Sequence, residues 1–174
     1  MPRVDEIKVF CSYSHQDRAL RDELVKHLEL LRQAMLIQTW HDGELTGGQD
    51  WQQEIETHLR DAHVILLLVS IDFLNSSFVR DHELPVALER HKSGDALVIP
   101  VIMRPVSWGQ SGLDFLQTLP DGLKPVVLWA PQDLAYVNVC EGLFAAVMVW
   151  QGRKVPSKPM PAPSTAVRRR VVDL

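Results

Sequence analysis

The sequence lacks the glycine-rich signatures that hold phosphates or present nucleophiles in many enzymes. Its 174 residues contain no GxxxxGK[ST] run, and no GxGxxG run follows the first apolar segment. Both absences argue against P-loop nucleotide hydrolysis and against Rossmann-type hydride transfer. No GxSxG run is present either, which excludes the strained serine elbow of the α/β-hydrolases.

Cysteine, positive charge and long apolar runs are scarce as well. Cys11 and Cys140 are the two cysteines, and their apolar surroundings predict reduced, buried thiols. The net charge of -4, with no basic stripe before the C-terminal tail, argues against a nucleic-acid surface. No apolar run is long enough to predict a membrane span, and the polar start, residues 1–6, does not predict a signal peptide. We therefore expect a cytoplasmic domain.

The histidines do not suggest a metal site. The seven histidines are scattered along the chain. His41 adjoins Asp42 and His82 adjoins Glu83, but neighbours in sequence seldom point at one ion. We therefore predict no metal site.

What is present is a regular alternation of apolar segments with helical patterns, which predicts an α/β fold. The expected strands are residues 7–13, 36–40, 64–69, 96–103 and 125–129, and the expected helices are 18–34, 50–62, 78–91 and 133–151. Short connections between such units imply a parallel sheet covered by helices on both faces. The prediction is a flavodoxin-like three-layer sandwich with a five-stranded parallel sheet of order 2-1-3-4-5.

The alternation ends near residue 151, which sets the expected domain boundary. Residues 1–151 form one domain of ordinary size, with 46% apolar residues in the whole chain. Residues 152–174 carry four prolines and the run Arg168–Arg170. This composition predicts a linker or tail, leading to a further domain, because it cannot form a packed core.

Several side-chain placements follow from the same patterns. One face of the first helix carries Leu20, Leu24, Leu28 and Leu31 at helical spacing. Pro100 predicts a bulge or an edge position in its strand, because proline cannot donate to a ladder. Residues 73–77 are expected to form a surface loop. For the last helix the expected inner face is Val137, Cys140, Phe144, Val147 and Met148.

The stretch 63–90 is the centre of the predicted site. Val64–Val69 is continuously apolar, as expected of a strand buried on both faces. Ligands of parallel sheets bind beyond the carboxyl ends of the strands, and Glu83 follows this strand. Because Pro85 is best tolerated in a first turn, the regular helix should begin near Leu84, with Glu83 at its N-terminus. Glu83 is then either a functional carboxylate or a helix-end acid that interacts with the macrodipole.

Three segments resemble signatures of the Toll/interleukin-1 receptor (TIR) domain family. FCSYSHQD at residues 10–17 resembles its first signature, and the glycine-containing residues 41–48 resemble its second, the BB loop. Residues 70–84, closing on Glu83 and Leu84, resemble its third-strand and following helical segment. The resemblance covers about residues 7–150, and the WHDGE style of the second segment is similar to bacterial members.

The resemblance implies one of two functions known for that family. One is cleavage of NAD⁺ at the nicotinamide–ribose bond, with a glutamate at the Glu-Leu position; this makes Glu83 the catalytic candidate. The implied activity needs no cofactor, since NAD⁺ is the substrate, and would serve bacterial antiphage defence after self-assembly. The alternative is a non-enzymatic adaptor that pairs TIR domains, and an unrelated flavodoxin-like domain that binds flavin or a nucleotide is a third interpretation.

The resemblance also implies substrate-binding residues and partners. The candidate substrate-binding residues are Ser12, Tyr13, Ser14, His15, Trp40, Asp42 and Phe78. From the residues alone, the run 12–15 is equally a polar turn and helix cap. Phe78 and Trp40 are equally packing residues. The expected partners are NAD⁺, a second TIR domain bound through residues 42–48, and a sensor domain in the same chain or another protein.

Overall fold

The computed structural model of the protein describes residues 7–35, 37–40 and 51–152, without the side chains of residues 34, 35, 37–40 and 51. The predicted association loop at 42–48 lies outside the described residues, as does the predicted tail, residues 152–174, apart from residue 152. The domain boundary near residue 151 therefore stays a prediction.

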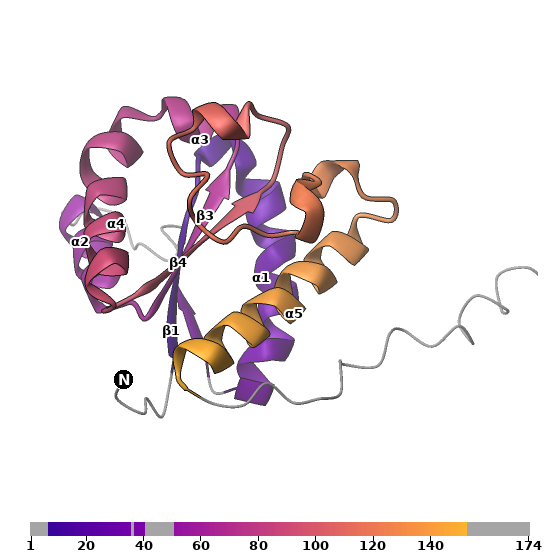
Figure 1. Cartoon of the computed structure of the whole chain (residues 1–174), viewed down its shortest axis with the longest axis horizontal. Coiled ribbons are helices and arrows are strands. Elements are labelled where there is room, and N and C mark those ends of the chain that lie inside the picture. Colours follow the sequence, from indigo (N-terminus) through magenta and orange to yellow (C-terminus); the bar gives the residue numbers. More distant parts are fainter. Residues whose placement is uncertain (1–6, 36, 41–50, 153–174) are drawn as a thin grey trace, which may run out of the picture.

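A parallel sheet of four strands forms the centre of the described chain. The strands are β1 (Ile7–Ser12), β2 (Ile37–Trp40), β3 (Val64–Val69) and β4 (Leu97–Ile102), in the order β2-β1-β3-β4. Every residue of β3 is buried, because β3 lies between two strands and has helices over both faces. The predicted order is confirmed for these four strands, and the α/β architecture with it (Figure 1).

The fifth strand, predicted at residues 125–129, is wrong. Val126–Leu128 forms a single 3-10 turn in which the Leu128 amide donates to the Pro125 carbonyl at 3.0 Å. Val126 is fully buried, so the apolar run does enter the core. Its backbone meets the end of β4 through one bond, from the Val127 amide to the Met103 carbonyl, which is a contact and not a ladder.

Of the two positions predicted for Pro100, a bulge or an edge, the described sheet shows the edge. β4 pairs with β3 on one side, and on the other side only an isolated bridge joins Val101 to Leu119. The Pro100 carbonyl accepts from the Leu119 amide, and the Ile102 amide donates to the Leu119 carbonyl. The missing amide hydrogen of Pro100 therefore costs no bond to β3.

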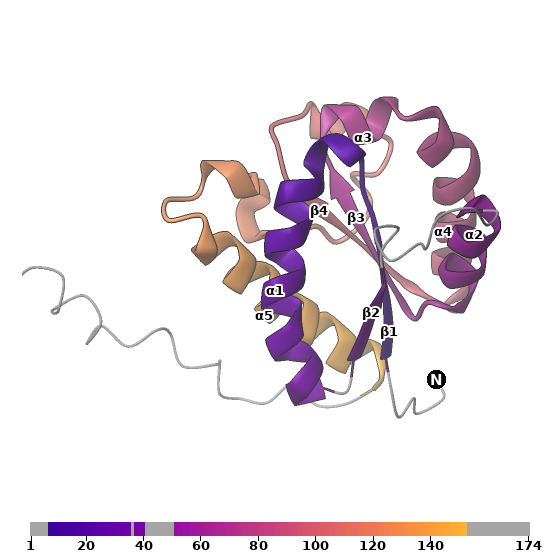
Figure 2. The same cartoon turned by 180° about the vertical axis from the view of Figure 1, so that it is seen from behind.

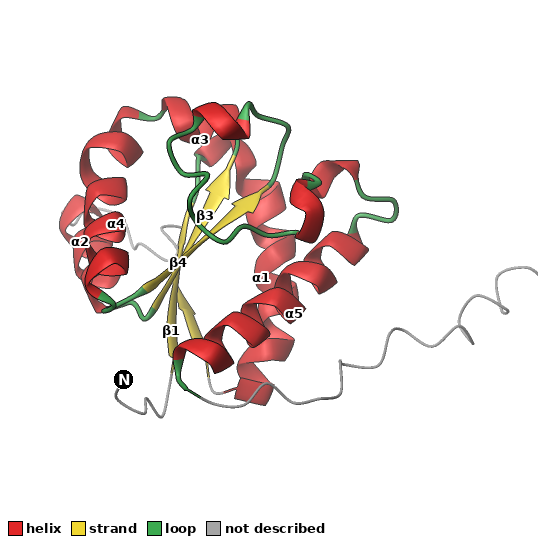
Figure 3. Ribbon diagram, in the orientation of Figure 1, coloured by secondary structure: helices red, strands yellow, loops and turns green. Residues whose placement is uncertain are grey.

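Helices cover both faces of the sheet. Helices α1 (Arg18–Met35) and α5 (Asp133–Trp150) lie on one face, and α2 (Trp51–Asp61) and α4 (Leu84–Ser93) on the other (Figures 1 and 2). Two apolar clusters correspond to these faces. Figure 3 shows the resulting layers, helix over sheet over helix. The predicted three-layer arrangement is therefore present.

The predicted inner face is confirmed for α1 and only in part for α5. The leucines of α1 at positions 20, 24, 28 and 31 are all buried. On α5 the buried side chains are Ala135, Tyr136, Val139, Leu143, Ala146 and Val147. Of the predicted inner face, Val147 is buried, and Cys140 and Phe144 are partly buried against the same cluster. Because α5 is apolar almost all round, its pattern does not single out one face.

Helix α5 also has the length and apolar composition that a membrane span needs. It is the one such helix in the described part of the chain. Its buried residues belong to the same core cluster as those of α1. In the described structure, 33% of this helix is buried.

The predicted surface loop at residues 73–77 is also wrong. Ile71–Asn75 forms a short helix, α3, in which Ser70 is the N-cap and its hydroxyl accepts from the Phe73 amide at 3.1 Å. The Phe73 side chain is 0% exposed. The Ser70 cap turns the chain so that Phe73 points into the cluster beneath α2 and α4.

At the amino end of the strands, Arg90 caps the C-terminus of α2. Its Nη1 donates to the carbonyls of Leu59 and Ala62 at 2.8 and 2.5 Å, and its Nη2 to that of Asp95 at 3.2 Å. The last carbonyls of a helix have no partners within the helix, and a guanidinium satisfies them well. Arg90 is therefore a structural residue, remote from the carboxyl edge of the sheet.

His63 joins the amino ends of β1 and β3. Its Nδ1 accepts from the Lys8 amide at 2.9 Å, and its own amide donates to the Lys8 carbonyl at 2.8 Å. Partial burial, the nearby Lys8 ammonium and the Arg90 guanidinium lower the pKa of His63 below its ordinary value of 6.5, against the opposing effect of Asp61. The neutral ring is the form that accepts the bond.

We expect His63 to make the fold sensitive to mild acid. Because its pKa is lower in the folded state, the unfolded chain binds the proton more readily. Stability is then complete above pH 6.5 and falls as the pH drops from there to the folded pKa, with a slope of at most about 1.4 kcal/mol per pH unit. Urea unfolding at several pH values should show that His63→Asn, which keeps an acceptor, removes this part of the slope. Equal slopes for both proteins would refute the assignment.

Candidate active site at the carboxyl edge of the sheet

Glu83 sits at a position that a core residue would normally take. Val79–Glu83 forms a π-helical turn, in which the Leu84 amide donates to the Val79 carbonyl, and α4 follows with Pro85 in its first turn. The inward stripe is Val79, Glu83 and Ala87. Glu83 is 6% exposed. The predicted helix start at Leu84 is confirmed, and the π turn, a feature frequent at functional sites, was not foreseen.

Ser12 holds the Glu83 carboxylate. The Ser12 hydroxyl, at the end of β1, donates to Glu83 Oε2 at 2.8 Å, and the Ser12 side chain is itself buried. A buried carboxylate is costly unless it accepts hydrogen bonds, and bonds to a charged acceptor are strong and directional. The bond therefore fixes one oxygen of Glu83 at the carboxyl edge of the sheet.

A cavity of about 330 Å³ opens beside this pair. Its walls come from three segments: the turn after β1, helix α2, and the chain after α3. The lining residues are Tyr13, Ser14, His15, Gln16, Ile55, Ser76, Phe78, Val79 and Glu83. Ligand pockets span roughly 300–1,000 Å³, so the volume suits part of a small molecule.

Three aromatic side chains, Tyr13, His15 and Phe78, contribute to the walls of the cavity. The Arg21 guanidinium lies 4.5 Å from the centre of the Tyr13 ring, and its Nη1 donates to the Tyr13 hydroxyl at 2.8 Å. The His15 ring meets Tyr13 edge-on at 6.1 Å. On the other wall, Phe78 lies 5.1 Å from His82. The cavity thus combines aromatic rings and polar side chains around one acid.

The turn after β1 is shaped by Ser14. Residues His15–Asp17 form a 3-10 turn, and the Ser14 hydroxyl accepts from the Gln16 amide at 3.4 Å. The Ser14 carbonyl accepts from the Asp17 amide at 2.8 Å. The turn brings the side chains of residues 13–16 to the cavity.

The structure brings six of the eight predicted site residues together. Glu83 and Ser12 are hydrogen-bonded, and Tyr13, Ser14, His15 and Phe78 line the cavity. Their predicted roles in binding and catalysis stay predictions. Trp40 is placed by its backbone alone, paired with Phe10, and Asp42 lies outside the described residues.

Four lining residues were missed. Gln16 and Ser76 lie in polar turns, which give no signal of a pocket, and Ile55 and Val79 follow the helical spacing of ordinary core residues. In the described part of the chain, no group of three His, Cys, Asp or Glu side chains is arranged to hold a metal ion.

Comparison with known proteins agrees with the geometry. The family model for the TIR domain matches residues 9–135. An uncharacterized protein, y4lF, from the bacterium Sinorhizobium fredii (strain NBRC 101917 / NGR234) is 41% identical over 135 residues, which cover 78% of this chain and 42% of that protein. The chain thus spans less than half the length of this relative. The family match over most of the fold, together with the bacterial relative, shows that the chain belongs to the TIR domain family, in its bacterial type.

Proposed function

We propose that this TIR domain cleaves the nicotinamide–ribose bond of NAD⁺, with Glu83 as the catalytic carboxylate. The observation that carries the proposal is a carboxylate at a core position, held by Ser12 and lining a cavity with aromatic walls. The TIR family includes both NAD⁺-cleaving enzymes and signalling adaptors. A buried acid beside a cavity is expensive to maintain, and this cost favours a chemical role for Glu83 over the adaptor function.

The chemistry needs little more than one well-placed negative charge. The bond between the ribose C1′ and the pyridinium nitrogen breaks, and its electron pair leaves with nicotinamide, which departs neutral. Positive charge then develops on the ribose in an oxocarbenium-like transition state. A fixed carboxylate stabilises that charge. Water adds to C1′ and loses a proton, which gives ADP-ribose; a hydroxyl of the same molecule gives a cyclic product instead.

The cavity suits the reacting half of the substrate. Nicotinamide and ribose together are small enough for about 330 Å³, and the adenylate half would extend outside. Tyr13 and Phe78 offer rings on which a flat pyridinium can stack, and a cationic ring gains from such contact. A nicotinamide ring stacked there would have its C1′ on the side of Glu83.

The test compares two forms of the same dinucleotide. We expect nicotinamide to be released from NAD⁺. Chromatography measures this release over a series of protein concentrations. We expect none from NADH, because its dihydropyridine would have to leave as an anion. Release from neither, at every concentration and in assembled samples, would overturn the proposal. Light scattering that shows association without any turnover would then favour the adaptor.

The cellular setting belongs to the same proposal. We place the domain in the cytoplasm, where NAD⁺ is abundant, as a part of bacterial antiphage defence. A sensor domain or partner protein would bring several copies together through residues 42–48. If cleavage requires several copies of the domain, the separate copies stay inactive until the sensor assembles them.

A further inference from the structure

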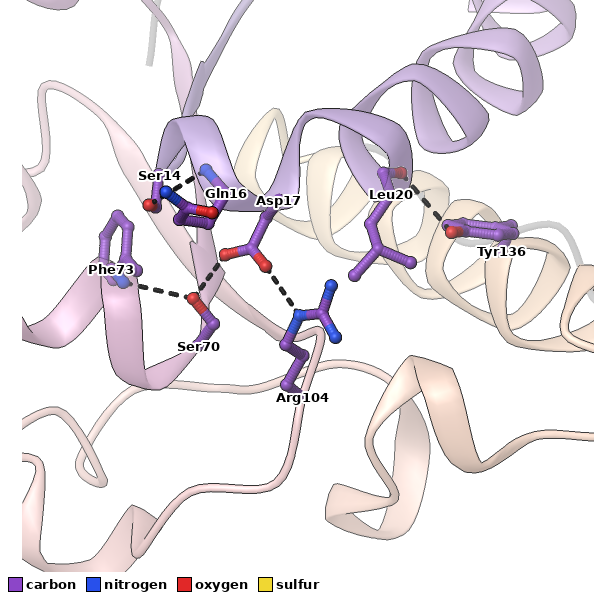
Figure 4. Close-up of polar contacts among 8 residues, drawn as sticks. All are labelled: Ser14, Gln16, Asp17, Leu20, Ser70, Phe73, Arg104 and Tyr136. Atoms are coloured by element: carbon purple, nitrogen blue, oxygen red, sulfur yellow. Dashed lines mark hydrogen bonds and ion pairs between the residues drawn. The ribbon is translucent and has the colours of Figure 1, made fainter.

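Three strand ends meet at one buried carboxylate that the proposed reaction does not use. Asp17 follows β1, Ser70 follows β3 and Arg104 follows β4. The Ser70 hydroxyl donates to Asp17 Oδ2, and Arg104 Nε donates to Asp17 Oδ1 at 2.7 Å. Asp17 is 0% exposed, whereas the Arg104 side chain is 45% exposed. Figure 4 shows the carboxylate between these two donors.

Stability alone does not explain this arrangement. Asp17 lies in the first turn of a helical segment, where an acid usually faces the helix N-terminus, but its side chain bonds two distant elements instead. Replacing a buried ion pair by apolar residues of similar volume is often neutral or stabilising. What a buried pair can supply is one fixed geometry, at a cost in stability.

That geometry includes both walls of the cavity. The Asp17 amide is bonded to the Ser14 carbonyl, so Asp17 anchors the turn that carries residues 13–16. Ser70 is the N-cap of α3 and bonds the Phe73 amide, so it anchors the segment that leads to residues 76–83. One carboxylate therefore ties the turn after β1 to the segment that carries Glu83.

We propose that Asp17, Ser70 and Arg104 are positioning residues, and that Arg104 fixes the wall formed by residues 13–16 relative to Glu83. The link to catalysis rests on the proposed function. Removing Arg104 leaves a buried charge without its cation, and the carboxylate gains by moving toward water. Because Asp17 is part of the turn, the turn moves with it. A shift of about 1 Å in such a wall can cost up to 10²-fold in rate.

Arg104→Gln is the test variant, and Arg90→Gln is its matched control. Both remove a partly buried guanidinium that binds across elements, but Arg90 lies at the opposite end of the sheet. Two measurements are made well below the unfolding midpoint of both variants: steady-state NAD⁺ cleavage, and amide hydrogen exchange in the protein without substrate. Asp17→Asn serves as a second variant, because asparagine keeps an oxygen for Arg104 and leaves no buried charge.

The expected results distinguish an effect on the position of the turn from an effect on the stability of the whole domain. Arg104→Gln should lower kcat by roughly tenfold to hundredfold and speed exchange of the Gln16 and Asp17 amides, while Arg90→Gln changes neither beyond its effect on global stability. Asp17→Asn should keep the exchange of the turn close to wild type. Equal exchange and equal rates in Arg104→Gln and Arg90→Gln would overturn the proposal. If wild type does not cleave NAD⁺, the proposed function fails, and the exchange comparison alone decides whether Arg104 holds the turn.

Discussion

Replacing Glu83 with glutamine should slow NAD⁺ cleavage by about 10³-fold and leave the fold intact. Glutamine has the same shape and keeps a carbonyl oxygen that accepts from the Ser12 hydroxyl. It loses the negative charge that the oxocarbenium-like transition state requires. Loss of one preorganised electrostatic group costs roughly 10²–10³-fold in kcat, and we expect about 10³-fold here. Nicotinamide release measures the rate, and thermal unfolding should show no loss of stability.

Two further variants make the result specific. Glu89→Gln makes the same chemical change on the same helix, but Glu89 is exposed, so its rate should equal that of wild type. Ser12→Ala removes the hydroxyl that orients Glu83 and should lower kcat by about tenfold, since a hydrogen bond to a charged group contributes roughly 1.5–3 kcal/mol. Retained turnover in Glu83→Gln, or equal losses in all three variants, would remove Glu83 from the catalytic role.

The central features of this fold could be predicted because their patterns admit one interpretation. The continuous apolar run of β3 is typical of a strand buried on both faces. The four leucines of α1 recur at helical spacing and are all buried. Pro85 limits where α4 can begin, and α4 does begin at Leu84. In each case a local rule and the final packing agree.

The errors occurred where a local pattern is ambiguous. A short apolar run such as 125–129 suits a strand or a buried turn equally, and here Pro125 starts a 3-10 turn. Helix α5 has few polar residues, so periodicity cannot orient it. The polar residues around Phe73 suggested a loop, although Ser70 followed by Asp72 also matches a helix N-terminus.

The site itself depends on contacts that spacing cannot reveal. Ser12 and Glu83 are 71 residues apart in the chain. Family resemblance named both residues, but neither their bond nor the π turn before α4 could be derived from the sequence. The Asp17 network is similar: Arg104 is 87 residues from Asp17, and nothing in the sequence pairs them.

Phe73→Ala should cause the largest loss of stability among the changes considered. Phe73 is 0% exposed and packs in the cluster beneath α2 and α4. Truncating a buried phenylalanine to alanine costs about 3–5 kcal/mol, because transfer energy is lost and a cavity remains. Since domains are stable by only about 5–15 kcal/mol, this is a large share of the total. Urea unfolding should show a lower midpoint with little change in slope.

Phe115→Ala is the matched control, because the same ring at position 115 is 67% exposed. Surface substitutions of this kind change the free energy of unfolding by at most about 0.5 kcal/mol. The loss of stability should therefore be several-fold larger for Phe73→Ala than for Phe115→Ala. If Phe73→Ala does not fold, Phe73→Leu should show a smaller loss in the same direction. Equal urea midpoints for the two alanine variants would contradict the burial of Phe73 and favour the surface loop predicted for residues 73–77. A specific loss at Phe73 instead means that α3 is packed into the core, so that the chain leading to Glu83 starts from a rigid base.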